Sequence, residues 1–309
     1  MATLRTAHHG VTVTDLQSVQ RAFNAVGFTH QSVGGVLAWS VDMPESARWM
    51  HAQMEPAFGD FRSLVLENPT THQQLFLIET AAHLRQARAS DVPFQSDLTI
   101  VVPVNDSPME AYQQMRAQAR ELSFSEPRPI DARNGIEALI DSQRYLLTNE
   151  TSSPTPYAIL HYHPDTFASL QRTFESKLGV HLEELPEVSP GARRFVFADM
   201  AARVEIEVCS ETPIATAQVG KRYPGANYLR LTDIDLDHVA LQVGDPVVPL
   251  VPPTVASGEW QWCFPIAHNA GYVYGPCDEL IEIYDRNVVY DASPPYCPEM
   301  ESANLQGSS

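Results

Sequence analysis

The feature that most constrains the fold of this sequence is a pattern that recurs four times along the chain. Each repeat has a strand-like segment, a helical segment and then three further strand-like segments, with a period of about 75 residues. The strand segments show alternating apolar residues, whereas the helical segments carry apolar residues at helical spacing. Because each unit has to bury its apolar face against another unit, the sequence predicts an α+β protein of four βαβββ units.

The first two units show this pattern most clearly. The run from His8 to Thr14 alternates like a strand and leads into a predicted helix over 15–26. Asp15 is placed to cap this helix, and Gly27 follows directly after its end. The remaining elements of the two units are predicted at 36–39, 61–66, 75–79, 98–104, 136–140 and 144–147, with helices at 45–54 and 108–122.

The third unit is predicted to open at residues 157–163 and to continue with a helix that stops at Gly179. The fourth unit is predicted to open at Leu236 and His238. Its helix is interrupted by four prolines between residues 245 and 253, and proline breaks helix interiors. The strands predicted in these units are 195–198, 203–208, 259–264, 271–274 and 280–284.

A polar segment that contains proline, residues 149–156, is predicted to join two domains. We expect residues 1–150 to hold units one and two, and residues 156–290 to hold units three and four. Residues 291–309 are polar and rich in proline, and are predicted to be a tail. Four such units favour two domains of mixed β-sheet with flanking helices.

The overall charge excludes some classes of partner. The formal net charge is −18, from 38 acidic and 20 basic residues. Nucleic acids and anionic membranes require a basic face, so neither is expected to bind this chain. The sequence has no apolar run long enough to cross a bilayer, and residues 1–5 do not begin a secretory signal. We therefore expect a cytoplasmic protein.

One phrase occurs near both ends of the chain. His8 is followed by an alternating run and then, seven residues later, by Asp15, and the same spacing joins His238 to Asp245. About forty residues after the second copy, Glu282 stands in the apolar run 280–284. A histidine on one strand and a glutamate on a later strand of one unit can hold a metal ion, and two facing units can complete its ligand set.

These segments resemble the vicinal oxygen chelate superfamily, which includes glyoxalase I, fosfomycin-resistance enzymes, bleomycin-resistance proteins and extradiol dioxygenases. The resemblance is carried by residues 8–16, 238–245 and 275–284. It implies that two paired units form a cup with a divalent metal ion at its bottom. The metal ligands that the resemblance implies are His8, His238, Glu282 and Glu79.

The family has two arrangements of four units, and they imply different ligand sets. If units one and four pair, as in glyoxalase-type fusions, the site holds the four residues just named. If units three and four pair, as in extradiol dioxygenases, a histidine of unit three, His161 or His163, replaces His8. Ala158 stands seven residues before Asp165, where the phrase would place a histidine, so we favour the outer pairing.

The resemblance implies a metalloenzyme that binds a small substrate through two adjacent oxygens. We favour dioxygenase-like chemistry with Fe(II), in which Tyr272 and His268 are acid–base candidates. A glyoxalase-like lyase or isomerase with zinc, nickel, cobalt or manganese is the alternative. A metal-free binding protein, as in bleomycin resistance, is a second alternative. We also expect an aromatic or vicinal-oxygen substrate and, because cupped sheets leave free edges, a homodimer.

Overall fold

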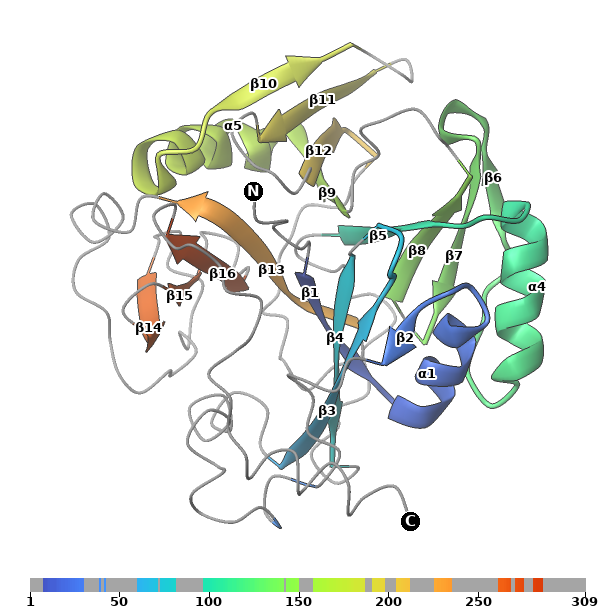
Figure 1. The fold of residues 1–309 in the computed structure, drawn as a ribbon. Helices are drawn as coiled ribbons and strands as arrows, with labels where there is room; N and C mark the ends of the chain where they lie inside the picture. Colours follow the sequence, from blue (N-terminus) through green and yellow to red (C-terminus); the bar gives the residue numbers. More distant parts are fainter. Residues whose placement is uncertain are drawn as a thin grey trace.

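A computed structural model describes the chain over residues 8–30, 39, 42, 60–71, 73–81, 97–141, 143–149, 158–186, 191–197, 204–211, 225–234, 261–267, 270–274 and 280–285. From residue 225 onward this description covers the course of the backbone and not the side chains. The described residues form two mixed sheets of eight strands, sheet A and sheet B, together with the helices that cover them (Figure 1).

Sheet A joins strands from the two ends of the chain. Its order is β14 (Gln261–Ala267), β15 (Ala270–Tyr274), β16 (Leu280–Asp285), β13 (Gly225–Ile234), β1 (His8–Val13), β4 (Gln74–Thr80), β3 (Phe61–Glu67) and β2 (Thr29–His30). Strands β1 and β13 run antiparallel at its centre, each with the last strand of its own unit parallel on its other side. Units one and four therefore share sheet A.

Sheet B has the same plan and is built from the middle of the chain. Its order is β10 (Leu182–Leu185), β11 (Ala192–Phe197), β12 (Val204–Cys209), β9 (Ala158–Tyr162), β5 (Asp97–Pro103), β8 (Gln143–Thr148), β7 (Gly135–Ile140) and β6 (Arg128–Ile130). Strands β5 and β9 are antiparallel neighbours at its centre. Units two and three therefore share sheet B, which confirms the outer pairing and shows that the pairing of units three and four was wrong.

Local sequence signals explain where the helices begin and end. Helix α1 (Leu16–Asn24) starts after Asp15, whose side chain accepts a hydrogen bond from Ser18 N at 2.8 Å, and Gly27 follows with a φ of +92°. Helix α4 (Pro108–Gln118) starts with a capping box between Ser107 and Glu110. Helix α5 (Pro164–Thr173) continues into a π-helical turn at Phe174–Leu178, within the predicted span.

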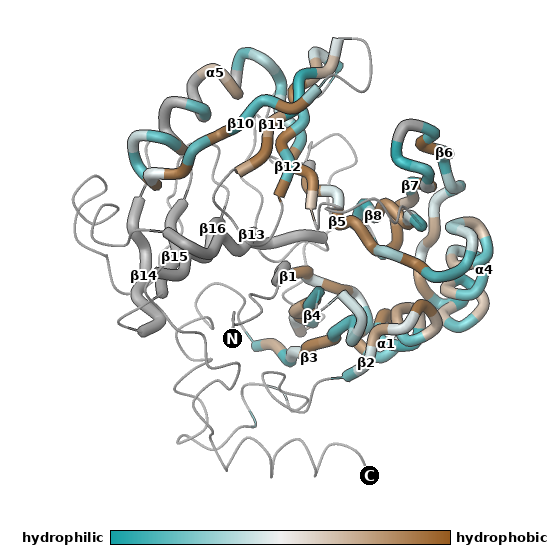
Figure 2. Tube along the Cα trace, turned by 45° about the horizontal axis from the view of Figure 1, so that its top comes forward, coloured by the Kyte–Doolittle hydropathy of each residue, from teal (hydrophilic) through white to brown (hydrophobic). Residues whose placement is uncertain are grey.

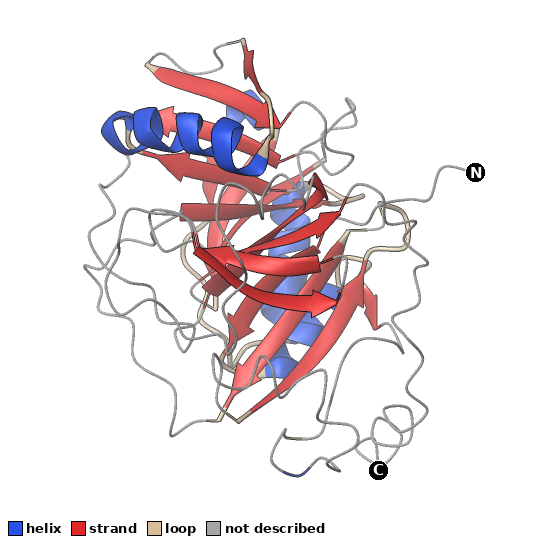
Figure 3. Cartoon of the chain, turned by 90° about the vertical axis from the view of Figure 1, so that its left-hand side faces the viewer, coloured by secondary structure: helices blue, strands red, loops and turns tan. Residues whose placement is uncertain are grey.

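The core lies between the sheets and the helices. Alternate strand residues, such as Val11 and Val13 on β1 and Leu98 and Ile100 on β5, belong to one continuous cluster that also includes buried residues of all three helices. In Figure 2 hydrophobic stretches mark the coloured strands of both sheets, such as β1, β5, β11 and β12, and helix α4 carries both colours. Figure 3 shows the helices against the strand layers. The strand faces turned away from this cluster are consequently the ones available for a site.

The first strand of unit four differs from the prediction. Strand β13 covers residues 225–234 and lies between β16 and β1, in the position predicted for a strand that opens at Leu236. Both segments alternate apolar residues: Leu229 and Leu231 in one, Val239 and Leu241 in the other. Local alternation cannot choose between them, because only pairing with β1 and β16 selects the strand. His238 lies outside the described residues.

Most other strand predictions are confirmed within a few residues, whereas β2, β6 and β10 were not predicted. The predictions at 36–38, 45–54 and 291–309 fall outside the described residues, and the domain boundary at 149–156 stays a prediction. Helix α4 ends at Gln118, earlier than predicted, because Ala119 leaves the helical conformation. None of the helices in the described part of the chain is long and apolar enough to span a membrane.

Candidate functional site: polar networks on the two sheets

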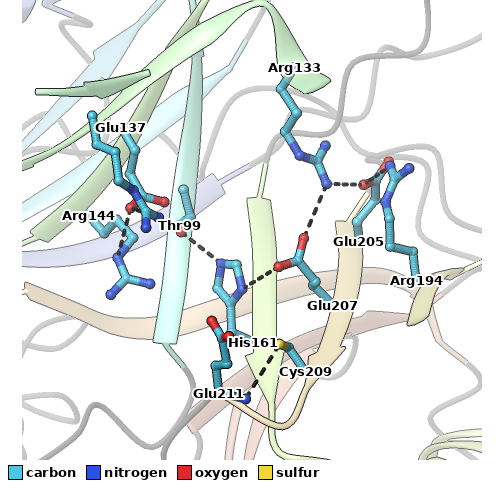
Figure 4. A network of polar contacts seen from close by, with 11 residues as sticks. Thr99, Arg133, Glu137, Arg144, His161, Arg194, Glu205, Glu207, Cys209 and Glu211 are labelled. Atoms are coloured by element: carbon cyan, nitrogen blue, oxygen red, sulfur yellow. Dashed lines mark hydrogen bonds and ion pairs between the residues drawn. The ribbon is translucent and has the colours of Figure 1, made fainter. Parts of the chain in front are cut away.

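Sheet B carries a polar network on the face turned away from the core cluster. Strand alternation points Leu160 and Ile206 into the core and leaves the opposite face to polar residues of the same strands. We call this group the sheet B network, and Figure 4 shows its contacts. Its members are Thr99 on β5, His161 on β9, Glu205 and Glu207 on β12, Arg194 on β11, and Arg133 in the short 3₁₀ helix Asp131–Arg133.

His161 stands between a hydroxyl and a carboxylate. Its Nε2 lies 2.9 Å from Thr99 Oγ1, and its Nδ1 lies 3.6 Å from Glu207 Oε1. An ionised carboxylate only accepts hydrogen bonds, so the neutral imidazole keeps its proton on Nδ1, facing Glu207. Nε2 then accepts from the Thr99 hydroxyl. The arrangement fixes both the tautomer and the orientation of the ring.

Glu205 is the buried anchor of the network. Its Oε2 accepts hydrogen bonds from Arg133 Nη2 at 3.0 Å and from Arg194 Nη2 at 2.6 Å, and its side chain is only 2% exposed. Burial acts to raise the pKa of this carboxyl, but the two guanidinium groups outweigh burial and hold the pKa below its usual value. Glu205 therefore stays ionised and neutralises one of the two arginine charges.

Glu207 is the more accessible carboxylate, with 30% of its side chain exposed. The His161 imidazole is the largest influence on it and lowers the pKa of this carboxyl, burial opposes that effect, and Arg133 and Arg194 add to it. Arg133 Nη2 lies 3.9 Å from Glu207 Oε2. The network therefore presents an oriented imidazole–carboxylate pair, a combination suited to proton transfer or to binding a polar ligand.

The sheet B network does not contain a complete metal site within the residues whose side chains are described. Over those residues, no group of three or more His, Cys, Asp or Glu side chains is placed to hold a metal ion. His161 and Glu207 supply two donors, fewer than the three protein ligands of a typical catalytic zinc site. His163, the other histidine considered for unit three, accepts a hydrogen bond from Asp165 N at 3.2 Å in the first turn of α5.

The strand register brings residues of the predicted metal site in sheet A into one region. One row across the sheet joins His9, Leu229, Ile281 and Val273 as register partners on β1, β13, β16 and β15. The next row contains Arg230, Glu282 and Tyr272. His8 immediately precedes His9, so one strand separates it from Glu282. Two strand spacings correspond to about 10 Å between backbones, a span that a histidine and a glutamate can bridge through one metal ion.

Sheet A and sheet B pair their central strands in the same way. Leu160 pairs with Leu98 and Ile206 in sheet B, and Leu229 pairs with His9 and Ile281 in sheet A. One residue further along, Glu207 pairs with His161 and Glu282 pairs with Arg230. The residue that pairs with Glu282 on the first strand of unit four is thus an arginine. The predicted histidine ligand of that unit, His238, follows β13 in the sequence.

Glu79 lies on the other face of sheet A. It pairs with Val13 on β1, which belongs to the core cluster, and its carboxylate is 8% exposed. Its Oε2 accepts hydrogen bonds from Leu16 N at 3.0 Å and Arg62 Nε at 3.0 Å. The positive end of the helix dipole also stabilises a carboxylate at the start of α1. Glu79 thus supports helix α1, and we leave it out of the proposed ligand set.

The remaining predicted site residues are only partly described. His8, Tyr272 and Glu282 lie on β1, β15 and β16, and their side chains are outside the described part of the structure. His238 and His268 lie outside it altogether. Sequence reasoning did not predict the Thr99–His161–Glu207 contacts, although the alternation of Glu205 and Glu207 in a strand pattern marked both as sharing one face.

Comparison with solved structures identifies the fold. Glyoxalase I from Zea mays superposes with a TM-score of 0.53 over 91% of this chain and 92% of that chain, at 11% sequence identity. A mutant of the Zea mays enzyme gives a TM-score of 0.51 over 91% and 94% of the two chains, at 12% identity. The chain has the vicinal oxygen chelate fold. Neither a protein-family model nor a curated protein sequence matches the chain, so among the comparisons it is the solved structures that show this fold.

The vicinal oxygen chelate fold accounts for the arrangement of both sheets. The four units of this chain pair as one with four and two with three, and each pair of units forms one eight-stranded sheet. Each sheet has a first-strand and a last-strand position at its centre, where ligands are expected from the resemblance. In sheet B, the first and last strands of unit three carry His161 and Glu207 of the sheet B network. In sheet A, Glu282 lies on the last strand of unit four, and His8 lies on the first strand of unit one.

Proposed function

We propose that this protein is a metal-dependent enzyme that acts on a small molecule chelated through two adjacent oxygens, with its metal site on sheet A. The strand order carries the proposal, because it sets β1, β13 and β16 side by side. His8 and Glu282 are the proposed ligands from β1 and β16, and His238 is proposed as the third. Imidazole and carboxylate donors suit zinc, nickel, cobalt, manganese and iron.

The pairing of units favours lyase or isomerase chemistry over the dioxygenase chemistry expected from the sequence. The outer pairing is the glyoxalase-type arrangement, and a glyoxalase I is among the solved structures that are similar over nine-tenths of this chain. A bound divalent metal would polarise a substrate carbonyl and stabilise the negative charge of an enolate. The chain's own residues would then move a proton next to that carbonyl, and Tyr272 is the candidate acid–base group.

A dioxygenase-type reaction is the second candidate, and one observation favours it. Tyr272 on β15 is the direct register partner of Glu282 on β16, so a candidate acid–base residue lies beside a proposed ligand. Two histidines and one carboxylate are also the ligand set of many Fe(II) oxygenases. Oxygen consumption with a catechol-like chelating substrate would support the dioxygenase-type reaction, because proton transfer alone consumes no oxygen.

The experiment that tests the metal site is metal analysis of anaerobically purified protein by mass spectrometry, expressed per chain. We expect about one divalent metal ion per chain in the wild type, and a large loss in Glu282→Gln and His8→Ala. Glu207→Gln is the matched control, because Glu207 also lies on the last strand of its unit and pairs with a residue of the parallel first strand. We expect this variant to retain its metal.

Three results of this experiment would contradict the proposal in different ways. Absence of metal after reconstitution would favour a metal-free binding protein. Equal loss in the Glu282 and Glu207 variants would indicate a general effect on folding. Loss of metal in Glu207→Gln alone would indicate that the metal binds on sheet B.

A further inference from the structure

Helix α4 borders a groove that the proposed reaction does not use. The groove lies between one side of the helix and the segment 122–127, and its volume of about 720 Å³ is in the range of small-molecule sites. It is formed by unit two and lies outside the sheet B network. The residues that line it are Met109, Tyr112, Gln113, Arg116, Ala117, Arg120, Leu122, Phe124, Glu126 and Pro127.

The floor of the groove is aromatic and firmly held. Tyr112 and Phe124 pack edge to face, with ring centroids 5.8 Å apart. The Tyr112 hydroxyl donates a hydrogen bond to Ser125 O at 2.6 Å, which ties the segment 122–127 to the helix. The Ser125 backbone N–H in turn donates to Leu139 O at 2.9 Å on β7. A groove with walls fixed in this way binds a ligand with little ordering cost.

Two arginines stand on the helix side of the groove. Arg116 lies in the last turn of α4, Arg120 lies two residues beyond the end of the helix, and both are exposed. Within the described residues neither of them has a carboxylate at ion-pair distance, although Glu126 lines the same groove. Two arginines without a carboxylate partner are notable in a chain of net charge −18.

The charge of Arg116 reaches the aromatic floor. Burial raises the pKa of the Tyr112 hydroxyl, and the positive charge of Arg116 acts against this rise. Arg116 and Tyr112 both line the groove, so one ligand can contact the guanidinium group and the tyrosine ring. Guanidinium groups bind carboxylates and phosphates through paired N–H donors, and they also stack on aromatic faces.

We propose that this groove is a second binding site, specific for a small organic anion with an aromatic or similarly flat apolar body. Tyr112, Leu122 and Phe124 would contact the body, and Arg116 and Arg120 would bind the acidic group. The site is independent of the metal on sheet A, so its ligand can bind without being converted. This assigns the α4 groove a role in recognition that is separate from catalysis.

The test is a titration of the whole chain with 2-naphthoate, followed by amide shifts in ¹H–¹⁵N NMR spectra. We expect saturable shifts confined to residues 109–127. Arg116→Gln combined with Arg120→Gln should weaken binding at least about tenfold, the effect of losing one charge-assisted hydrogen bond. The matched control combines Arg144→Gln and Arg193→Gln, which removes two arginines that are not among the residues lining the groove, and should bind as the wild type does.

The neutral analogue 2-naphthylmethanol and the variant Glu282→Gln complete the experiment. We expect the alcohol to bind at least about tenfold more weakly than the anion, and Glu282→Gln to bind naphthoate normally. Equal binding of acid and alcohol would overturn the proposal, as would equal weakening in the two double variants. Shifts outside 109–127, or no binding at millimolar naphthoate, would also reject it. Loss of binding in Glu282→Gln would show that naphthoate binds at the metal site instead.

Discussion

Glu207 and Glu282 each lie on the last strand of their own unit, and each pairs with a residue on the parallel first strand of that unit. The partner of Glu207 is His161 and the partner of Glu282 is Arg230. In sheet B the histidine and the carboxylate contact each other within a network of arginines. The two sheets therefore have the same strand plan but present different side chains beside these glutamates, which supports different roles for the two sheets.

The role of Glu79 can be tested by stability and metal content together. Glu79→Gln removes the ion pair in which Arg62 Nη2 lies 2.8 Å from Glu79 Oε2, while the amide oxygen can still accept from Leu16 N. We expect the free energy of unfolding to fall by about 1–2 kcal/mol and the metal content to remain unchanged. A folded variant that has lost its metal would return Glu79 to the ligand set.

Glu205 is expected to be the most sensitive position of the sheet B network. Glu205→Gln leaves the Arg133 and Arg194 side chains, only 10% and 12% exposed, without their shared carboxylate. Removing one partner of a buried ion pair typically costs about 3–5 kcal/mol, and urea unfolding would measure this loss. Glu184→Gln, which breaks a fully exposed pair with Arg193, is the control and should leave stability unchanged. Similar losses of unfolding free energy in Glu205→Gln and Glu184→Gln would contradict a special stabilising role for the buried Glu205 carboxylate.

Acid should weaken the fold through the same carboxylates. The pKa values of Glu205 and Glu207 are lowered in the folded protein, so folding favours their ionised forms. Their contribution is present above the pKa of an unfolded glutamate, about 4.3, and is lost as the pH falls through the lower folded values. We expect Glu205→Gln with Glu207→Gln to flatten the decline of unfolding free energy below about pH 4.3. An unchanged slope would refute this linkage.

The tautomer of His161 is a direct test of the imidazole geometry. ¹⁵N spectra of the ring should show a protonated Nδ1 and an unprotonated Nε2 in the neutral form, because Glu207 faces Nδ1 and Thr99 faces Nε2. Glu207→Gln should reduce the preference for this tautomer, since an amide can accept or donate. Thr99→Val, which removes only the hydroxyl, should retain it. A proton on Nε2 in the wild type would exclude the proposed arrangement.

Local sequence determined the elements that depend on neighbouring residues. Asp15 and Gly27 set the two ends of α1, and the alternation from His8 to Val13 gave a strand, because caps and side-chain periodicity act within a few residues. Repetition of the same order of elements indicated four units. The resemblance carried by residues 8–16 and 275–284 then led to the fold that comparison with solved structures supports.

Only the tertiary structure decided which strands became neighbours and which face each side chain occupied. The sequence could not choose β13 over the run that begins at Leu236, nor place Glu79 on the helix side of its sheet, because both depend on register with distant strands. The contacts of His161 with Thr99 and Glu207 join residues 62 and 46 positions apart in the chain. Such contacts arise from long-range pairing of strands, and no local pattern encodes them.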